Sequence, residues 1–204
     1  MNYIAKHLVF LGSLYFVFSF TEYFVHRHVM HGSKTGVNHL AKNHWTHHEH
    51  TLDDLNLKKS DEYNSNVNKY LGLYFIWIYT LAVFIVGLTE AYVLNLLLCT
   101  NIDIRYVVLY AGVFAGYQSS FWNTIHPDIH NIHENITWLE GVPGSDIWRL
   151  LYSNIAVSND MTLYDWFKRN HRLHHLRKGE RKGNYNVTLP GADWFMGTMY
   201  SVQT

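Results

Sequence analysis

The sequence predicts an all-α integral membrane protein, a bundle of about three spanning helices with a helical, histidine-rich cap at one end. Three observations predict it. Apolar residues gather in blocks near 3–24, 70–88 and 104–123, each close to the roughly 20 residues that a helix needs to cross a ~30 Å hydrocarbon core. Of the 15 histidines, all except His7 lie between or after these blocks, where most of them form groups. The chain has 204 residues and a formal net charge of zero, which suits a single domain over 1–204 and gives no sign of nucleic-acid binding.

The first apolar block resembles a secretory signal, because Lys6 precedes an apolar run from Leu8 to Phe20. No small-x-small cleavage site follows, however, and the run continues directly into His26. Cleavage would remove the helix that carries the first histidine pair. We therefore interpret 3–24 as a retained span that emerges at one membrane face near Glu22.

The second and third apolar blocks are separated by a stretch that is open to two interpretations. Glu90, Asn95, Asn101 and Asp103 are costly in lipid, so 89–103 is expected to be a loop or an interfacial helix. The alternative is one overlong, tilted helix that reaches Cys99. The polar residues from His50 to Asn68 are expected to be a solvated connector.

Three spans would place every histidine group on the same face of the membrane. One span followed by a two-span hairpin returns the chain to that face, and the lobe 126–204 has no span of its own. Most basic residues fall on the same face: Lys34, Lys42, Lys58, Lys59, Lys69, Arg149, Lys168 and Arg169. By the positive-inside rule this face is cytosolic, with Lys6 and Arg105 as exceptions. We expect the endoplasmic reticulum of a eukaryote or the inner membrane of a bacterium.

Two H-x-x-H-H boxes predict a metal site. On a helix, positions i, i+3 and i+4 share a face, so three imidazoles converge within one turn. The boxes are His44, His47, His48 and His171, His174, His175. Imidazole is the commonest protein ligand for transition metals. A lone histidine is more often a core or surface residue, but two such boxes in one short chain make that interpretation untenable.

Two histidine pairs accompany the boxes. His126 and His130 are one helical turn apart and face the same way. His26 and His31 lie roughly 140° apart on an ideal helix, so either the helix ends between them or they serve different metals. His28 and His31 would make a better helical pair. Whether His26 or His28 is the ligand stays open.

Ten box histidines exceed the four ligands of a tetrahedral zinc site, so the sequence predicts two metal ions. The single Cys99 excludes a thiolate cluster, and the donors must be nitrogen and oxygen. An all-histidine site with exchangeable positions suits redox iron, with zinc as a possible substitute. Glu22, one turn before His26, and Asp128, between the members of its pair, are placed to accept hydrogen bonds from ligand rings. The alternative for both carboxylates is solvation at headgroup level.

The order of these four groups resembles the fatty acid hydroxylase superfamily, which includes sterol desaturases and related lipid hydroxylases. The flanks Glu22–Arg27 and Asn186–Thr198 are also similar to that superfamily, and the resemblance covers about His26 to Thr198. It implies a membrane-bound non-haem di-iron enzyme that uses dioxygen and two electrons to oxidise an unactivated C–H bond of a lipid. It implies ten iron ligands: His26, His31, His44, His47, His48, His126, His130, His171, His174 and His175. Outside the pattern, His28, His39, His50 and His133 would lie beside the site or on the surface.

The resemblance also bears on partners. His126-Pro127 lacks the glycines that follow in a fused haem domain, so the electrons would come from a separate donor protein. The substrate would be a lipid reached from the bilayer. Aromatic side chains would line its route or simply pack the helices: Tyr74, Phe75, Trp77, Tyr117, Phe121 and Trp122. The chain is short, so a second subunit would complete a shallow pocket, and the oligomeric state stays open.

The leading functional hypothesis is hydroxylation of a fatty acyl chain. Sterol oxidation and carotenoid ring hydroxylation share the same chemistry, while acyl desaturases have three boxes with different spacing. The long tail with Asp193–Thr198, expected to close the C-terminal lobe, favours the acyl and sterol branches. A membrane metal transporter or buffer is the alternative from another class, but transporters place ionisable residues inside their spans and these histidines avoid them.

Overall fold

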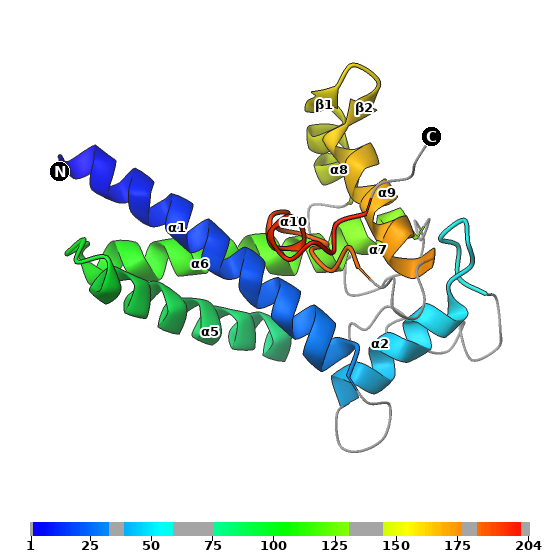
Figure 1. The fold of residues 1–204 in the computed structure, drawn as a ribbon, viewed down its shortest axis with the longest axis horizontal. Helices are drawn as coiled ribbons and strands as arrows, with labels where there is room; N and C mark the ends of the chain where they lie inside the picture. Colours follow the sequence, from blue (N-terminus) through cyan, green and yellow to red (C-terminus); the bar gives the residue numbers. More distant parts are fainter. Residues whose placement is uncertain (1, 33–38, 59–75, 131–144, 177–182, 201–204) are drawn as a thin grey trace.

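The structure is a computed structural model that describes residues 2–32, 39–58, 76–130, 145–176 and 183–200 (Figure 1). The described part of the chain is mostly helical, in agreement with the predicted class. Its longer helices are α1 (Tyr3–Phe24), α2 (His39–His50), α5 (Ile76–Leu97), α6 (Ile104–Ser120), α8 (Ser145–Ser153) and α9 (Leu163–Leu176). The shorter elements are two π-helical stretches, η1 (Val25–Met30) and η2 (Phe121–Ile125), the single turns α7 (His126–Ile129) and α10 (Ala192–Phe195), and the strands β1 (Ala156–Ser158) and β2 (Met161–Thr162).

The three long helices α1, α5 and α6 pack into one apolar bundle, with α1 crossing the α5–α6 pair (Figure 1). One face of α1 is buried through Phe10, Leu14 and Phe18. Small residues on the facing helices let the backbones approach: a Cβ on Gly87 would lie only 3.0 Å from the Phe18 ring. Large side chains on one helix therefore pack against small ones on its neighbours.

Two described helical stretches are long and apolar enough to cross a membrane, Tyr3–Met30 and Thr80–Leu97. The α5 helix continues past the expected end at residue 88, so the alternative of one long helix describes 89–97 correctly. Its polar residues have partners that allow this. Glu90 accepts a hydrogen bond from the Thr21 hydroxyl at 2.5 Å, and the Asn95 side chain accepts from the Ile102 N–H at 3.0 Å.

The third predicted span corresponds to α6, which has 17 residues and continues into η2 as one helical rod. It is not one of the two stretches above, so a third crossing remains a prediction. Residues 70–75 of the predicted second span lie outside the described residues.

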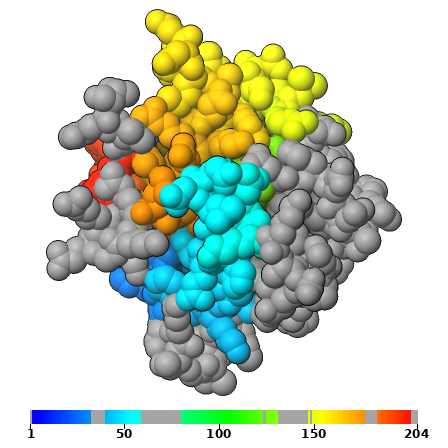
Figure 2. Space-filling view, turned by 90° about the vertical axis from the view of Figure 1, so that its right-hand side faces the viewer, coloured from blue at the N-terminus to red at the C-terminus, as the bar shows by residue number. Residues whose placement is uncertain are grey.

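A cap of shorter helices forms at the end of the bundle where α1 and α6 finish and α5 begins (Figure 1). The chain passes from η2 into α7, and Phe121, Ile125 and Ile129 pack against Phe167 of α9. β1 and β2 form an antiparallel hairpin between α8 and α9. Viewed from the cap end (Figure 2), α2 and the residues that follow it to Lys58 lie against α9. Arg172 of α9 donates to the Asp53 carbonyl oxygen at 2.9 Å across this contact.

The C-terminal segment closes on itself through Asp193, as the sequence predicts for this tail. The Asp193 carboxylate accepts hydrogen bonds from the Asn186 N–H at 2.5 Å and the Thr198 hydroxyl at 2.7 Å. The Asn186 side-chain oxygen accepts in turn from the Asp193 N–H at 2.8 Å. These reciprocal bonds join the two ends of the segment into a compact loop.

Candidate metal centre

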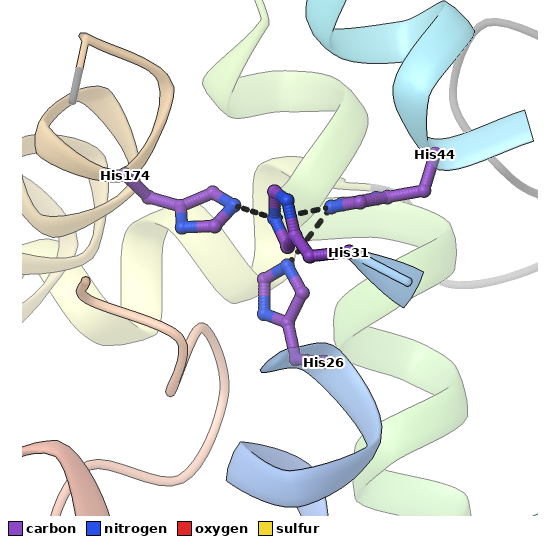
Figure 3. A group of neighbouring side chains, drawn as sticks. All are labelled: His26, His31, His44 and His174. Carbon is purple, nitrogen blue, oxygen red and sulfur yellow. Dashed lines mark hydrogen bonds between the residues drawn. The ribbon is translucent and has the colours of Figure 1, made fainter. Parts of the chain in front are cut away.

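The fold brings the ten box histidines together in two buried groups. The first, the His26 group, contains His26, His31, His44 and His174 (Figure 3). The second, the His47 group, contains His47, His126, His130 and His171. Within each group, one ring nitrogen of every member lies within 4.8 Å of those of the others. Two four-histidine groups that could hold metal ions therefore exist, where the sequence predicts a two-metal site.

The two remaining box histidines add a fifth ring to each group. The Nε2 atom of His48 lies 3.1 Å from Nε2 of His44 and 3.0 Å from Nε2 of His174. The Nε2 atom of His175 lies 3.0 Å from Nε2 of His171. The His48 and His175 rings stack on each other with centroids 4.1 Å apart, so the two groups are in direct contact.

Each H-x-x-H-H box serves both groups, in opposite senses. In α2, the first and last histidines (His44, His48) join the His26 group, whereas His47 joins the other. In α9, the first and last histidines (His171, His175) join the His47 group, whereas His174 joins the His26 group. Each group thus takes one histidine pair, two rings from one box and one from the other.

A π-helical turn explains how His26 and His31 reach the same group. The His31 N–H donates to the His26 carbonyl oxygen at 3.0 Å, an i→i+5 bond that widens the helix at the end of α1. The two rings then lie with centroids 5.2 Å apart. The angle of roughly 140° expected on an ideal α-helix does not apply, and His26 rather than His28 faces the site.

Backbone carbonyls set the orientation of three ligand rings. The Nδ1–H groups of His26, His130 and His174 donate to carbonyl oxygens at 2.5, 2.7 and 2.9 Å. The acceptors are Tyr185, Leu55 and Gly183. A carbonyl oxygen only accepts, so each of these rings carries its proton on Nδ1 and directs the lone pair of Nε2 into its group.

Burial keeps the rings in the neutral form that a metal requires. Desolvation, reinforced by the neighbouring imidazoles, holds the pKa of His44, His48, His126, His171 and His175 well below the ordinary value. For His130, desolvation lowers the pKa to about 4, although its bond to the Leu55 carbonyl opposes the shift. Neutral rings have lone pairs available for coordination at neutral pH.

The donor arrangement fits a bound cation. Four Nε2 atoms form a closed ring with neighbouring separations of 3.0, 3.1, 3.0 and 3.0 Å, in the order His31, His44, His48 and His174. Because His174 carries its proton on Nδ1, its Nε2 has only a lone pair and cannot donate a hydrogen bond to either neighbour. His126 is 1% exposed, and neither of its ring nitrogens has a hydrogen-bond partner among the described residues. Converging lone pairs and an unsatisfied buried imidazole would be costly unless a cation lies between them.

The two carboxylates predicted beside the ligands have other partners. Glu22 accepts from the backbone N–H groups of Thr188 and Leu189 at 2.8 and 2.9 Å, while its expected donor His26 bonds to Tyr185 instead. Asp128 accepts from the Tyr164 hydroxyl at 2.5 Å and from the Arg149 guanidinium at 3.3 Å. Both carboxylates hold the elements that carry ligands and do not orient ligand rings in these bonds.

The histidines outside the box pattern lie apart from the two groups, as far as the structure describes them. His28 is exposed and stacks on Phe24. The Nδ1–H of His50 donates to the Thr46 carbonyl oxygen at 2.8 Å. His133 and the side chain of His39 lie outside the described residues. His28, which the sequence leaves open as a ligand or as a neighbour of the site, thus stacks on Phe24 and not on a member of either group.

Trp122 and Tyr185 contact the ligands in ways that the sequence alone does not reveal. The Trp122 ring lies 4.6 Å from that of His126 and 6.3 Å from that of His26, so it borders both groups. Tyr185 is 4% exposed, and its ring lies 5.6 Å from those of His31 and His174. Trp122 lies one helical turn before His126 in the sequence, and this spacing could have indicated its contact with the site. Tyr185 follows no ligand spacing.

Most aromatic residues proposed for a lipid route pack the core where they are described. Tyr117 donates its hydroxyl proton to the Thr188 carbonyl oxygen at 2.9 Å, and Phe121 packs on Phe167 with centroids 4.9 Å apart. Tyr74, Phe75 and the side chain of Trp77 lie outside the described residues. Of the aromatic residues that the structure describes here, Trp122 alone lies directly against both groups.

Comparison with models of known protein families, with curated proteins and with solved structures found no match.

Proposed function

We propose that this protein is a membrane-bound non-haem di-iron oxygenase that hydroxylates a lipid, with a fatty acyl chain as its substrate. The observation that carries the proposal is the pair of five-histidine groups in contact at one end of a bundle of apolar helices. The order of the histidine boxes, which resembles that of the fatty acid hydroxylase superfamily, supports the same chemistry.

The spacing of the donors favours iron over structural zinc. With a metal–imidazole distance of about 2.1 Å, two nitrogens at a right angle are about 3.0 Å apart, whereas tetrahedral positions are about 3.4 Å apart. The four separations around the ring of His31, His44, His48 and His174 are 3.0–3.1 Å. Five neutral nitrogens at right angles are one ligand more than a closed tetrahedral zinc site has. They leave the sixth position of an octahedron for a reactant.

Two iron ions in these groups would supply the reductive activation of dioxygen that hydroxylation of a C–H bond needs. In the balanced reaction, R–H, O2, two electrons and two protons give R–OH and water. The chain itself holds the rings neutral, fixes their orientation through backbone carbonyls and keeps the groups buried from bulk water. A buried site protects reactive species from side reactions.

The arrangement also suggests how the reactants arrive. A lipid chain in the bilayer can approach along the bundle, where Trp122 at the end of α6 borders both groups. The basic residues near the cap favour a cytosolic placement, from which a separate donor protein would deliver electrons. The two apolar stretches that can span a membrane are consistent with this placement.

Sterol and carotenoid hydroxylation remain alternatives within the same chemistry, because the site geometry carries no information on the shape of the lipid. Metal transport is the alternative from another class. The histidine groups lie at the end of the bundle, from His26 onwards, and not in the middle of the apolar helices where transporters place their ligands (Figure 1). This position disfavours transport.

The test is oxygen incorporation in cells that express the protein. Cells grown under 18O2 would be extracted, and fatty acids, sterols and carotenoids would each be screened for an added 18O atom. The expected result is a labelled acyl product that is absent with His174→Ala and retained with His28→Ala, a matched change at an exposed histidine. Labelled product that survives His174→Ala would refute the proposal, and labelled sterol or carotenoid would redirect it to those substrates.

A further inference from the structure

The C-terminal segment 186–196 starts next to Tyr185, which contacts the His26 group, and runs from there along α1 away from the histidines. The Tyr15 hydroxyl donates to the Pro190 carbonyl oxygen at 2.5 Å, and the Phe195 ring lies 5.7 Å from that of Phe16. Tyr15 precedes Glu22, near which the span is expected to reach the membrane face, by seven residues, which corresponds to about 10 Å along a helix at 1.5 Å per residue. The α10 turn packs against the cap-side half of α1, where the Phe195 ring also lies 6.1 Å from that of Phe20 (Figure 1). The segment thus reaches about a third of the way into a ~30 Å hydrocarbon core.

The backbone of this irregular segment is paired with side chains of the spanning helices. Ser19 donates to the Leu189 carbonyl oxygen at 2.8 Å and accepts from the Ala192 N–H at 2.9 Å. The Thr188 carbonyl oxygen accepts from Tyr117, and its N–H donates to Glu22. Non-helical backbone is tolerated at membrane depth only where its polar groups are satisfied within the protein. The polar residues of α1 meet this requirement.

The opposite side of the segment is apolar and open. Trp194, Phe195 and Met196 are 69%, 56% and 42% exposed. They continue the exposed apolar surface of α1, where Phe16 is 45% exposed and Phe24 is also open. An exposed apolar patch of this kind would be unfavourable in water, whereas in a bilayer it is the expected outer surface.

We propose that residues 186–196 form a re-entrant membrane segment whose outer face, formed by Trp194, Phe195 and Met196, contacts the acyl chains of the bilayer. The segment enters from the cap side, pairs its backbone with α1 and α6, and leaves on the same side. This inference rests on the membrane placement in the proposed function but not on the metal or the reaction.

Spin labels test the segment directly, because the chain has a single cysteine, Cys99. In a Cys99→Ser background, a nitroxide would be attached at Trp194→Cys, with Met196→Cys as a second position should the first variant fail to fold. Ile85→Cys, on an exposed site in the middle of α5, is the lipid reference. Asp160→Cys, in the exposed turn of the hairpin, is the water reference. The protein would be reconstituted in phosphatidylcholine vesicles.

Collision rates with oxygen, which partitions into lipid, and with a water-soluble nickel chelate would be compared. We expect the labels at 194 and 196 to match the one at 85, with high oxygen and low nickel accessibility. Labels at 194 and 196 that match the one at 160, with 85 in lipid, would overturn the re-entrant segment alone. A water-accessible label at 85 would overturn the membrane placement itself. Dipolar broadening with low accessibility to both reagents would show a second copy on this face and would also overturn the proposal.

Discussion

Replacing Glu22 with glutamine should destabilise the contact between α1 and the C-terminal segment. The Glu22 carboxylate accepts four hydrogen bonds. One oxygen receives the Thr188 N–H and hydroxyl, both at 2.8 Å, and the other receives the Leu189 N–H at 2.9 Å and the Asn186 amide at 3.3 Å. Glutamine has the same shape but only one acceptor oxygen. In either orientation of the glutamine side chain, its NH2 group would face two hydrogen-bond donors and could accept from neither.

The size of the effect follows from these bonds. A buried donor left without an acceptor costs about 1–3 kcal/mol, and the longer Asn186 bond belongs at the low end of that range. Removing a buried charge recovers part of the loss. We expect Glu22→Gln to lower the free energy of unfolding by about 2–4 kcal/mol. For a chain of this size, each kcal/mol lowers the Tm by about 2–4 °C.

Thermal unfolding in detergent, followed by tryptophan fluorescence, would measure the change. The matched control is Glu49→Gln, an exposed carboxylate for which we expect little change. Thr188→Val removes one of the four donors, so its cost should be smaller in the Glu22→Gln background than in the parent. A Tm within about 2 °C of the parent for Glu22→Gln, or strictly additive costs, would refute the role assigned to this carboxylate.

Three further outcomes are expected. Asp128→Asn should lower the free energy of unfolding by about 1.5–3 kcal/mol, because it replaces a charge-assisted bond from Tyr164, and urea or thermal unfolding would measure it. His174→Ala should reduce the iron content of anaerobically purified protein from two ions per chain towards one, measured by elemental analysis, because only the His26 group loses a ring. Gly191→Ala should cost about 1–3 kcal/mol of stability in the same unfolding assay, because Gly191 has φ +147° and an added Cβ would lie 3.1 Å from the Ser19 hydroxyl oxygen.

Each of these expectations has a matched control in the chain. Asp160 is exposed, so Asp160→Asn should change the free energy of unfolding little. Equal losses of stability for the substitutions at 160 and 128 would contradict the role given to the buried Asp128. His28→Ala should retain both ions, and a loss of metal equal to that of His174→Ala would count against the assigned ligands. Gly12→Ala has open space around its Cβ and a helical backbone, so it should not destabilise. If it cost as much as Gly191→Ala, backbone strain would not be the cause.

The sequence predicts the helical fold and the meeting of the four histidine groups, because the apolar blocks between the boxes indicate a helical hairpin that returns the chain to the same end of the bundle. It fails where polar residues have distant partners. Glu90 and Asn95 favoured an end of the helix near residue 88, but Glu90 bonds to Thr21 on α1. Pairing of this kind cannot be read from either residue alone.

The surroundings of the ligands were beyond the sequence for a different reason. Three rings are oriented by the carbonyl oxygens of Leu55, Gly183 and Tyr185, and every residue has a carbonyl group. The π-helical stretch at His26–His31 depends on i→i+5 bonds, among them the one from the His31 N–H to the His26 carbonyl oxygen, that the residue types do not specify. Glu22 and Asp128 were recognised as important carboxylates, but their partners lie on the C-terminal segment and on α8 and α9.

Because neighbouring residues of α2 belong to different histidine groups, the spacing between the two centres is a property of a single helical turn. His47 and His48 are adjacent, and so are His174 and His175 in α9. Changes in loop length would therefore leave that spacing unaltered. An insertion of one residue between His47 and His48 would rotate one relative to the other by about 100° and would damage both centres at once.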